Sequence, residues 1–202
     1  MEHDNAAPPT TERPAPTRPA AQLEPWARIH AVPYGIPEIA LASYAYAASV
    51  MDRSATGCHI GWPTLAAIGA VASDHGRAGG ATLGRDATVS PALRALSREN
   101  MESRTVADTD GGRIDGDNHQ DVPMGPMQLM PSVWEQWSVS ARNETTASPD
   151  NLDDAALSVA RLLCAAGGDL ATAEGWAKAV AAVNPAASFA SAVHDRAAEF
   201  SR

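Results

Sequence analysis

Residues 108–134, DTDGGRIDGDNHQDVPMGPMQLMPSVW, hold the densest mixture of turn-forming, acidic and large apolar residues in the chain. In the first half, aspartates alternate with glycines, which favours tight backbone turns with carboxylates projecting around them. In the second half, Gly125 lets another surface approach the backbone, Pro126 stiffens the turn, and Gln128 offers an amide that donates and accepts hydrogen bonds. We expect a short helix carrying Trp134 to follow. This density indicates a built site.

The composition indicates one helical domain. With 202 residues and 45% hydrophobic content, the chain can bury one good core. Aromatic residues make up only 5% and alanine is abundant, so helices packed through small side chains are favoured over a sheet. The net charge of −9, with no run of Lys and Arg, argues against nucleic acid as a partner. The same charge gives no electrostatic attraction to an acidic cell wall.

The N-terminal segment, residues 1–29, is a Pro/Ala/Thr mixture without periodic apolar positions. We predict a disordered or polyproline-like tether there and a folded domain over residues 30–202. The tether would space the domain from a membrane, pass it through a wall, or serve as a plain spacer. No run of about 18 apolar residues is present, so no membrane-spanning segment is expected. No signal peptide or anchor is recognisable either.

Apolar residues recur at helical spacing along much of the remaining chain. The predicted helices cover residues 36–53, 61–75, 152–165 and 170–183, and a last one reaches Phe200. Residues 81–107 are poorly patterned, and we allow one turn of helix there at residues 91–97. The pattern therefore predicts a mainly α fold.

Four further motifs accompany GPMQLMPSVW, residues 125–134, which resembles the GPMQ-F-x-P-S-x-W signature of lytic murein transglycosylases. They are DTDGGRIDGD at 108–117, GIPEIALASYAYAA at 35–48, IGAVASDHGRAGG at 68–80, and the run from Asn151 to Cys164. Together they resemble the actinobacterial relatives of membrane-bound lytic transglycosylase B. The resemblance implies a lysozyme-like helical domain of the goose-type lysozyme kind.

The resemblance also implies a reaction, but this chain lacks the family's active-site residue at two positions. Lytic transglycosylases cleave the β-1,4 bond between N-acetylmuramic acid and N-acetylglucosamine; one glutamic acid protonates the leaving oxygen and then helps to form a 1,6-anhydro ring. The position of that glutamate is Ala72 here, and the position of a tyrosine that reaches the family's active site is Val183. Since one acid does both jobs, its loss should remove most of the rate, on the order of 10²–10⁴-fold.

Two explanations for Ala72 stay open. Either an engineered Glu→Ala change traps a substrate, or the protein has drifted from catalysis; Val183 favours drift, because a trapping change would leave the tyrosine alone. Asp74 is a weak substitute acid, because its side chain is turned roughly 200° away from position 72 in a regular helix. We therefore predict no catalytic residue. The rival prediction is a working lytic transglycosylase, seen with its acid replaced or using another acid.

The resemblance places a set of residues against sugar, namely Ser73, Gly125, Met127, Gln128 and Trp134. A cleft is expected between the helix end at residues 72–77 and the loop at residues 124–130. The implied ligand is the peptidoglycan glycan strand, and the implied protein partner is another cell-wall hydrolase or a division protein. The expected location is outside the cytoplasm, in contact with the cell wall, and no cofactor is expected.

No metal site is expected. Residues 138–149, where family members often carry a calcium-loop-like segment, lack the acid spacing of such a loop. Asp115 and Asp117 have three candidate roles: capping turn amides, which is favoured, facing the cleft, or binding a cation, although their spacing matches no complete calcium loop. The six histidines show no metal-ligand spacing.

The chain has two cysteines, Cys58 and Cys164. Two thiols alone leave a disulfide and two free core cysteines equally open. The resembled family has cysteines at both places, which implies a disulfide between them.

Overall fold

The computed structural model describes residues 18–96, 106–142 and 144–202, and this part of the chain is mainly helical, as predicted. Its α-helices are α1 (Glu24–His30), α2 (Glu38–Ser54), α3 (Trp62–Ser73), α4 (Pro131–Trp137), α5 (Leu152–Gly167), α6 (Ala173–Val183) and α7 (Ala187–Phe200). Its 3-10 helices are η1 (Pro19–Leu23), η2 (Val32–Tyr34) and η3 (Ala78–Gly80). Its strands are β1 (Thr82–Leu83), β2 (Val89–Ser90), β3 (Val106–Ala107) and β4 (Gln120–Asp121).

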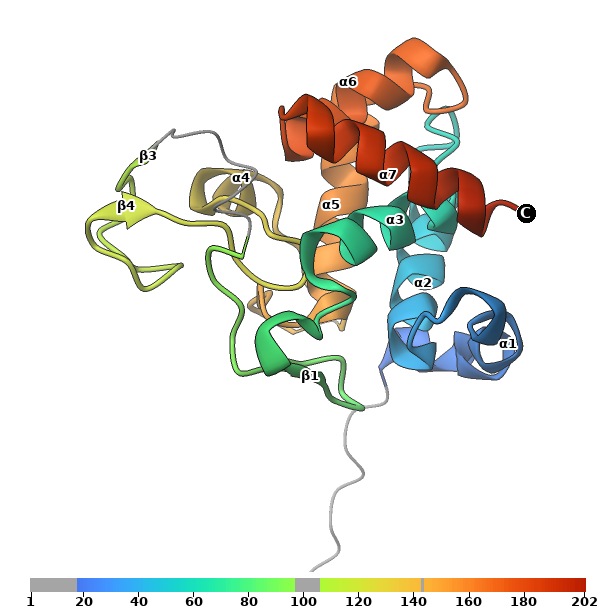
Figure 1. Cartoon of the computed structure of the whole chain (residues 1–202), viewed down its shortest axis with the longest axis horizontal. Helices are drawn as coiled ribbons and strands as arrows, with labels where there is room; N and C mark the ends of the chain where they lie inside the picture. Colours follow the sequence, from blue (N-terminus) through green and yellow to red (C-terminus); the bar gives the residue numbers. More distant parts are fainter. Residues whose placement is uncertain (1–17, 97–105, 143) are drawn as a thin grey trace, which may run out of the picture.

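Helix α5 lies at the centre of the helical body, with α2 and α6 packed against it, while α7 lies across α3 (Figure 1). The start of α5 is fixed by Asn151, whose side chain accepts hydrogen bonds from the backbone N–H groups of Asp153 at 3.1 Å and Asp154 at 3.4 Å. The fully buried apolar side chains of α5 include Leu152, Val159 and Leu163. One continuous core therefore forms around this helix.

Helices α2 and α3 approach closely because α3 has a glycine where they meet. A Cβ atom at Gly69 would overlap the hydroxyl group of Tyr44, a fully buried residue of α2. That hydroxyl also forms a hydrogen bond with Nδ1 of His75 at 3.2 Å. A small residue on α3 thus lets a large α2 side chain reach the C-terminal end of α3.

The poorly patterned residues 81–107 contain strands β1 and β2, which pair antiparallel with Thr82 opposite Ser90. The turn of helix allowed at residues 91–97 is wrong for residues 91–96, which are described and not helical. The backbone there bonds to another segment instead: Arg94 forms a β-bridge with Met124, and the N–H of Ala95 donates to the carbonyl oxygen of Pro123 at 2.9 Å. These partners lie too far along the chain for a local pattern to reveal them.

The folded part begins earlier than predicted. Residues 18–29, assigned to the tether, form η1 and α1, both of which contact α2. Arg18 is 9% exposed, and its guanidinium donates hydrogen bonds to Asp153 on α5 at 2.7 and 2.8 Å. This anchor was missed because a lone arginine in a Pro/Ala-rich segment creates no periodic pattern. The rest of the predicted tether, residues 1–17, lies outside the described residues.

The predicted disulfide is confirmed. Cys58, in the turn before α3, is bonded to Cys164 in the last turn of α5, and their Cα atoms are 5.3 Å apart. The bond closes a loop between positions separated by 106 residues. It therefore ties the turn after α2 to the central helix.

Replacement of both cysteines by serine should lower the free energy of unfolding by about 2–4 kcal/mol, because the cross-link restricts the unfolded chain. Urea denaturation of the oxidised wild type and of the double variant measures the difference. Wild type treated with a reductant should match the double variant. An oxidised wild type that is no more stable than its reduced form would contradict the prediction.

Candidate functional site

The end of α3 is joined directly to the loop that follows residue 124. Ser73, 2% exposed, donates a hydrogen bond from Oγ to the carbonyl oxygen of Pro126 at 2.6 Å. Oγ of Ser73 also accepts a hydrogen bond from the backbone N–H of Gly76 at 2.8 Å. Ala72, one residue earlier, is 5% exposed. The helix end and the loop therefore form one structural unit, with a methyl group at position 72.

The loop itself is closed by its own backbone and by one side-chain amide. The N–H of Met124 donates to the carbonyl of Leu129 at 2.9 Å, and the reverse bond is 3.1 Å long. Gln128 uses both ends of its amide: Nε2 donates to the Gly125 carbonyl at 2.8 Å, and Oε1 accepts the N–H of Leu96 at 2.9 Å. Gln128 also has a φ of 50°, a strained left-handed conformation that these bonds hold in place.

Of the residues predicted to contact sugar, three come together at this junction: Ser73 donates to Pro126, and Gln128 donates to Gly125. Met127 and Trp134 lie in the hydrophobic core, 1% and 6% exposed. All five predicted residues therefore have their side chains or backbone packed against protein.

Val183, at the position where the resembled family has a tyrosine, is the last residue of α6 and packs partly buried against the same core. Its apolar side chain offers no hydroxyl group for a hydrogen bond.

Asp74 lies at the surface, just beyond the end of α3. It follows α3 in a left-handed conformation with a φ of 49°, its side chain is 61% exposed, and it pairs with Arg77 at 2.8 Å. Asp74, the weak candidate for a substitute acid, is thus one partner of a surface ion pair.

His75 is a buried and neutral side chain. It is 3% exposed, and burial lowers its pKa to about 4, with the positive charge of Arg77 contributing to the decrease. Its Tyr44 partner is also buried, which raises the pKa of the phenol. At neutral pH both groups are uncharged, so their hydrogen bond holds the end of α3 without placing a charge in the core.

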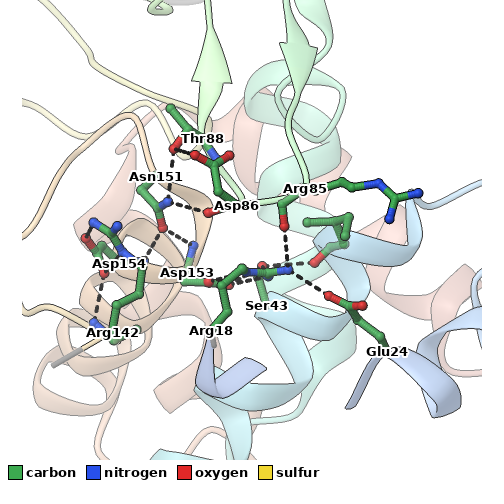
Figure 2. A network of polar contacts seen from close by, with 12 residues as sticks. Arg18, Glu24, Ser43, Arg85, Asp86, Thr88, Arg142, Asn151, Asp153 and Asp154 are labelled. Carbon is green, nitrogen blue, oxygen red and sulfur yellow. Dashed lines mark hydrogen bonds and ion pairs between the residues drawn. The ribbon is translucent and has the colours of Figure 1, made fainter. Parts of the chain in front are cut away.

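A second polar cluster surrounds the start of α5 (Figure 2). Asp153, 1% exposed, accepts two hydrogen bonds from Arg18 and one from Ser43 Oγ at 2.6 Å. The Arg18 guanidinium also donates to Glu24 at 2.9 Å and to the carbonyl oxygen of Arg85 at 3.2 Å. This buried ion pair joins the N-terminal segment, α2, the β1–β2 hairpin and α5.

Asp154 organises the polar loop before α5. Fully buried, it accepts the backbone N–H groups of Ala141 at 2.8 Å and Ser148 at 2.9 Å, and it pairs with Arg142 at 2.9 Å. The loop that lacks calcium-loop spacing is therefore held by an arginine and by amide groups around one carboxylate.

The acidic segment between β3 and β4 confirms the amide-capping role of Asp115 and Asp117. Asp115 accepts the N–H groups of Asp117 at 3.0 Å and Val122 at 2.8 Å, and Asp117 accepts that of His119 at 2.9 Å. Three other carboxylates converge. Oxygens of Asp108, Asp110 and Asp121 lie within 4.8 Å of one another. Sequence reasoning missed this group, because pairing of β3 with β4 is needed to bring Asp121 back to Asp108.

A pocket of about 580 Å³ lies elsewhere, between the start of α2 and the η3–β1 segment. Its lining includes Arg28, Ile36, Glu38, Arg77, Thr82 and Leu83. None of the five residues predicted to contact sugar lines it. The motif resemblance implies a cleft between residues 72–77 and 124–130. Of these residues only Arg77 lines the pocket, so the pocket is distinct from that expected cleft.

Comparisons with family models, with curated proteins and with solved structures found no match for this chain. Fold and site thus define a mainly helical protein with one disulfide and a tightly bonded junction between α3 and the 124–130 loop. Within the described residues, no helix has the length and apolar character needed to cross a membrane.

Proposed function

We propose that this protein is a non-catalytic cell-wall protein that binds peptidoglycan glycan strands, or that positions another wall hydrolase, on a domain related to lytic transglycosylases. The observation that carries the proposal is the hydrogen bond between Ser73 and Pro126, which joins the two segments that resemble motifs of that family, next in sequence to the buried Ala72. The position where the resembled family has its catalytic acid carries a methyl group, which supports binding or positioning rather than catalysis.

Two further observations support the absence of catalysis. Asp74, the nearest carboxylate along the chain, is exposed and paired with Arg77. Val183 provides no hydroxyl group where the family has a tyrosine. General acid catalysis needs a protonated group within hydrogen-bond reach of the leaving oxygen, and neither residue supplies one.

The direct test is a peptidoglycan turbidity assay with detection of anhydro-muropeptides. The wild-type chain should release none above the buffer control, while a pull-down with insoluble peptidoglycan should retain it. Turnover above background would defeat the non-catalytic proposal and favour the rival, a working transglycosylase that uses another acid. Failure of the pull-down would remove glycan binding and leave a protein-binding role.

Ala72→Glu should create activity if the remaining machinery is intact. A glutamate at this buried position would have its pKa raised by desolvation, as a general acid requires, and should raise the rate by about 10²–10⁴-fold over the wild type. The matched control is Ala72→Gln, which has the same shape and no proton to transfer. Equal rates for the two variants would show that a further element, such as the tyrosine missing at Val183, has been lost as well.

A further inference from the structure

We propose that Asp108, Asp110 and Asp121 form a calcium-binding site at the neck of the β3–β4 hairpin. The three side chains each offer an oxygen, and these oxygens lie within 4.8 Å of one another. Calcium binds oxygen ligands at about 2.3–2.6 Å, so ligands on opposite sides of one ion are about 5 Å apart. The spacing of the three oxygens fits a shared ion.

The hairpin explains why residues distant in sequence meet. Val106 pairs with Asp121 and Ala107 with Gln120, so the end of β3 lies beside β4. Asp108 directly follows β3, and Asp121 is 3% exposed. Figure 1 shows this hairpin extending from the helical body, away from α5 and α7.

Backbone amides orient the carboxylates. Oδ1 of Asp108 accepts the N–H groups of Asp110 at 3.0 Å and Gly111 at 2.8 Å. Oδ2 of Asp110 accepts the N–H of Ile114 at 2.8 Å. Asp121 accepts the N–H and hydroxyl groups of Thr109 at 2.9 and 2.7 Å. The side chains are thus held before any ion arrives, which reduces the entropy lost on binding.

An independent observation points to a ligand: Oδ1 of Asp110 is buried and has no hydrogen-bond partner among the described residues. A buried carboxylate oxygen without a partner is costly, by at least about 1–3 kcal/mol, and native proteins rarely leave one. The arginine of this loop does not satisfy it, because Arg113 pairs with Glu135 at 2.6 Å. A cation among the three carboxylates would satisfy this oxygen and offset the repulsion between them.

The donor set selects the ion. All three ligands are carboxylates, which suit hard cations rather than zinc or copper. Magnesium requires near-ideal octahedral geometry, whereas calcium accepts irregular sets of six to eight oxygens, including water. An irregular loop with three fixed carboxylates fits calcium better.

Isothermal titration of the metal-free full chain with CaCl2 tests the proposal. We expect one ion per chain with a Kd of roughly 10⁻⁵–10⁻³ M, and weaker binding of MgCl2. Asp110→Asn should weaken calcium binding at least about tenfold, since it removes the charge of the central ligand. Asp117→Asn is the matched control, because Asp117 lies in the same loop but is not one of the three proposed ligands. This variant should bind calcium with the affinity of the wild type.

Circular dichroism would establish that each variant is folded, and Asp108→Asn serves as a second ligand variant if Asp110→Asn is not. Absence of saturable binding up to about 10 mM calcium would overturn the proposal, since that concentration exceeds the Kd values of even weak extracellular calcium-binding modules. Unchanged affinity in a folded ligand variant would overturn it too. Neither result depends on glycan binding or on activity.

Discussion

Asp153→Asn should destabilise the protein by about 3–5 kcal/mol, because it leaves the buried guanidinium of Arg18 without its main counter-ion. Arg18 and Asp153 are 9% and 1% exposed, and two hydrogen bonds of 2.7 and 2.8 Å join them. Ser43, which donates to the same carboxylate at 2.6 Å, would also lose a charged acceptor. Urea denaturation with intact disulfide measures the change.

Two further variants distinguish the effect of losing a buried ion pair from the effect of losing a surface charge. Arg28→Ala removes an exposed pair with Glu38, 3.0 Å long, and should change stability by less than about 1 kcal/mol. The double change Arg18→Met with Asp153→Leu should recover much of the loss, because it removes both charges. A loss below about 1 kcal/mol for Asp153→Asn would mean that water reaches this pair and that the N-terminal segment is not firmly attached.

Gly125→Ala should cost about 3–5 kcal/mol, since two penalties combine. Gly125 has a φ of 69°, which an alanine adopts only with strain, and its added Cβ would overlap the backbone carbonyl of Pro149. A backbone group cannot rotate aside as a side chain can, so the loop would have to move. Thermal unfolding, followed by circular dichroism, should show a lower Tm, and peptidoglycan retention should fall with it.

The matched control is Gly111→Ala. Gly111 has a φ of 70°, almost the same conformation, but an added Cβ would meet nothing within 4 Å. This variant should lose only the conformational part, about 1–2 kcal/mol. Equal losses of stability at the two positions would show that the close approach of Pro149 to Gly125 does not contribute to the cost of the Gly125→Ala change.

The helices could be predicted because local patterns determine them. Helix α5 has an asparagine cap and apolar residues at helical spacing, and α7 ends at Phe200 where its amphipathic pattern ends. The two-residue strands could not be predicted, because each depends on a partner brought near by the rest of the fold. The same holds for Arg18, whose partner Asp153 is 135 positions away.

The contacts of the candidate site were likewise predictable from the sequence where they are local and not where they are long-range. The capping bonds of Asp115 and Asp117 include amides two residues away, and the sequence indicated them. The Ser73–Pro126 bond spans 53 positions, and motif resemblance alone suggested that these two segments meet. The meeting of Asp121 with Asp108 and Asp110 required strand pairing that no local pattern encodes.

The attachment of Arg18 to α5 has a mechanical consequence. Tension applied through residues before 18 would be carried by two parallel charge-assisted bonds to Asp153, at the first turn of the central helix. Single-molecule stretching from the N-terminal side should therefore register Asp153→Asn as a lower rupture force.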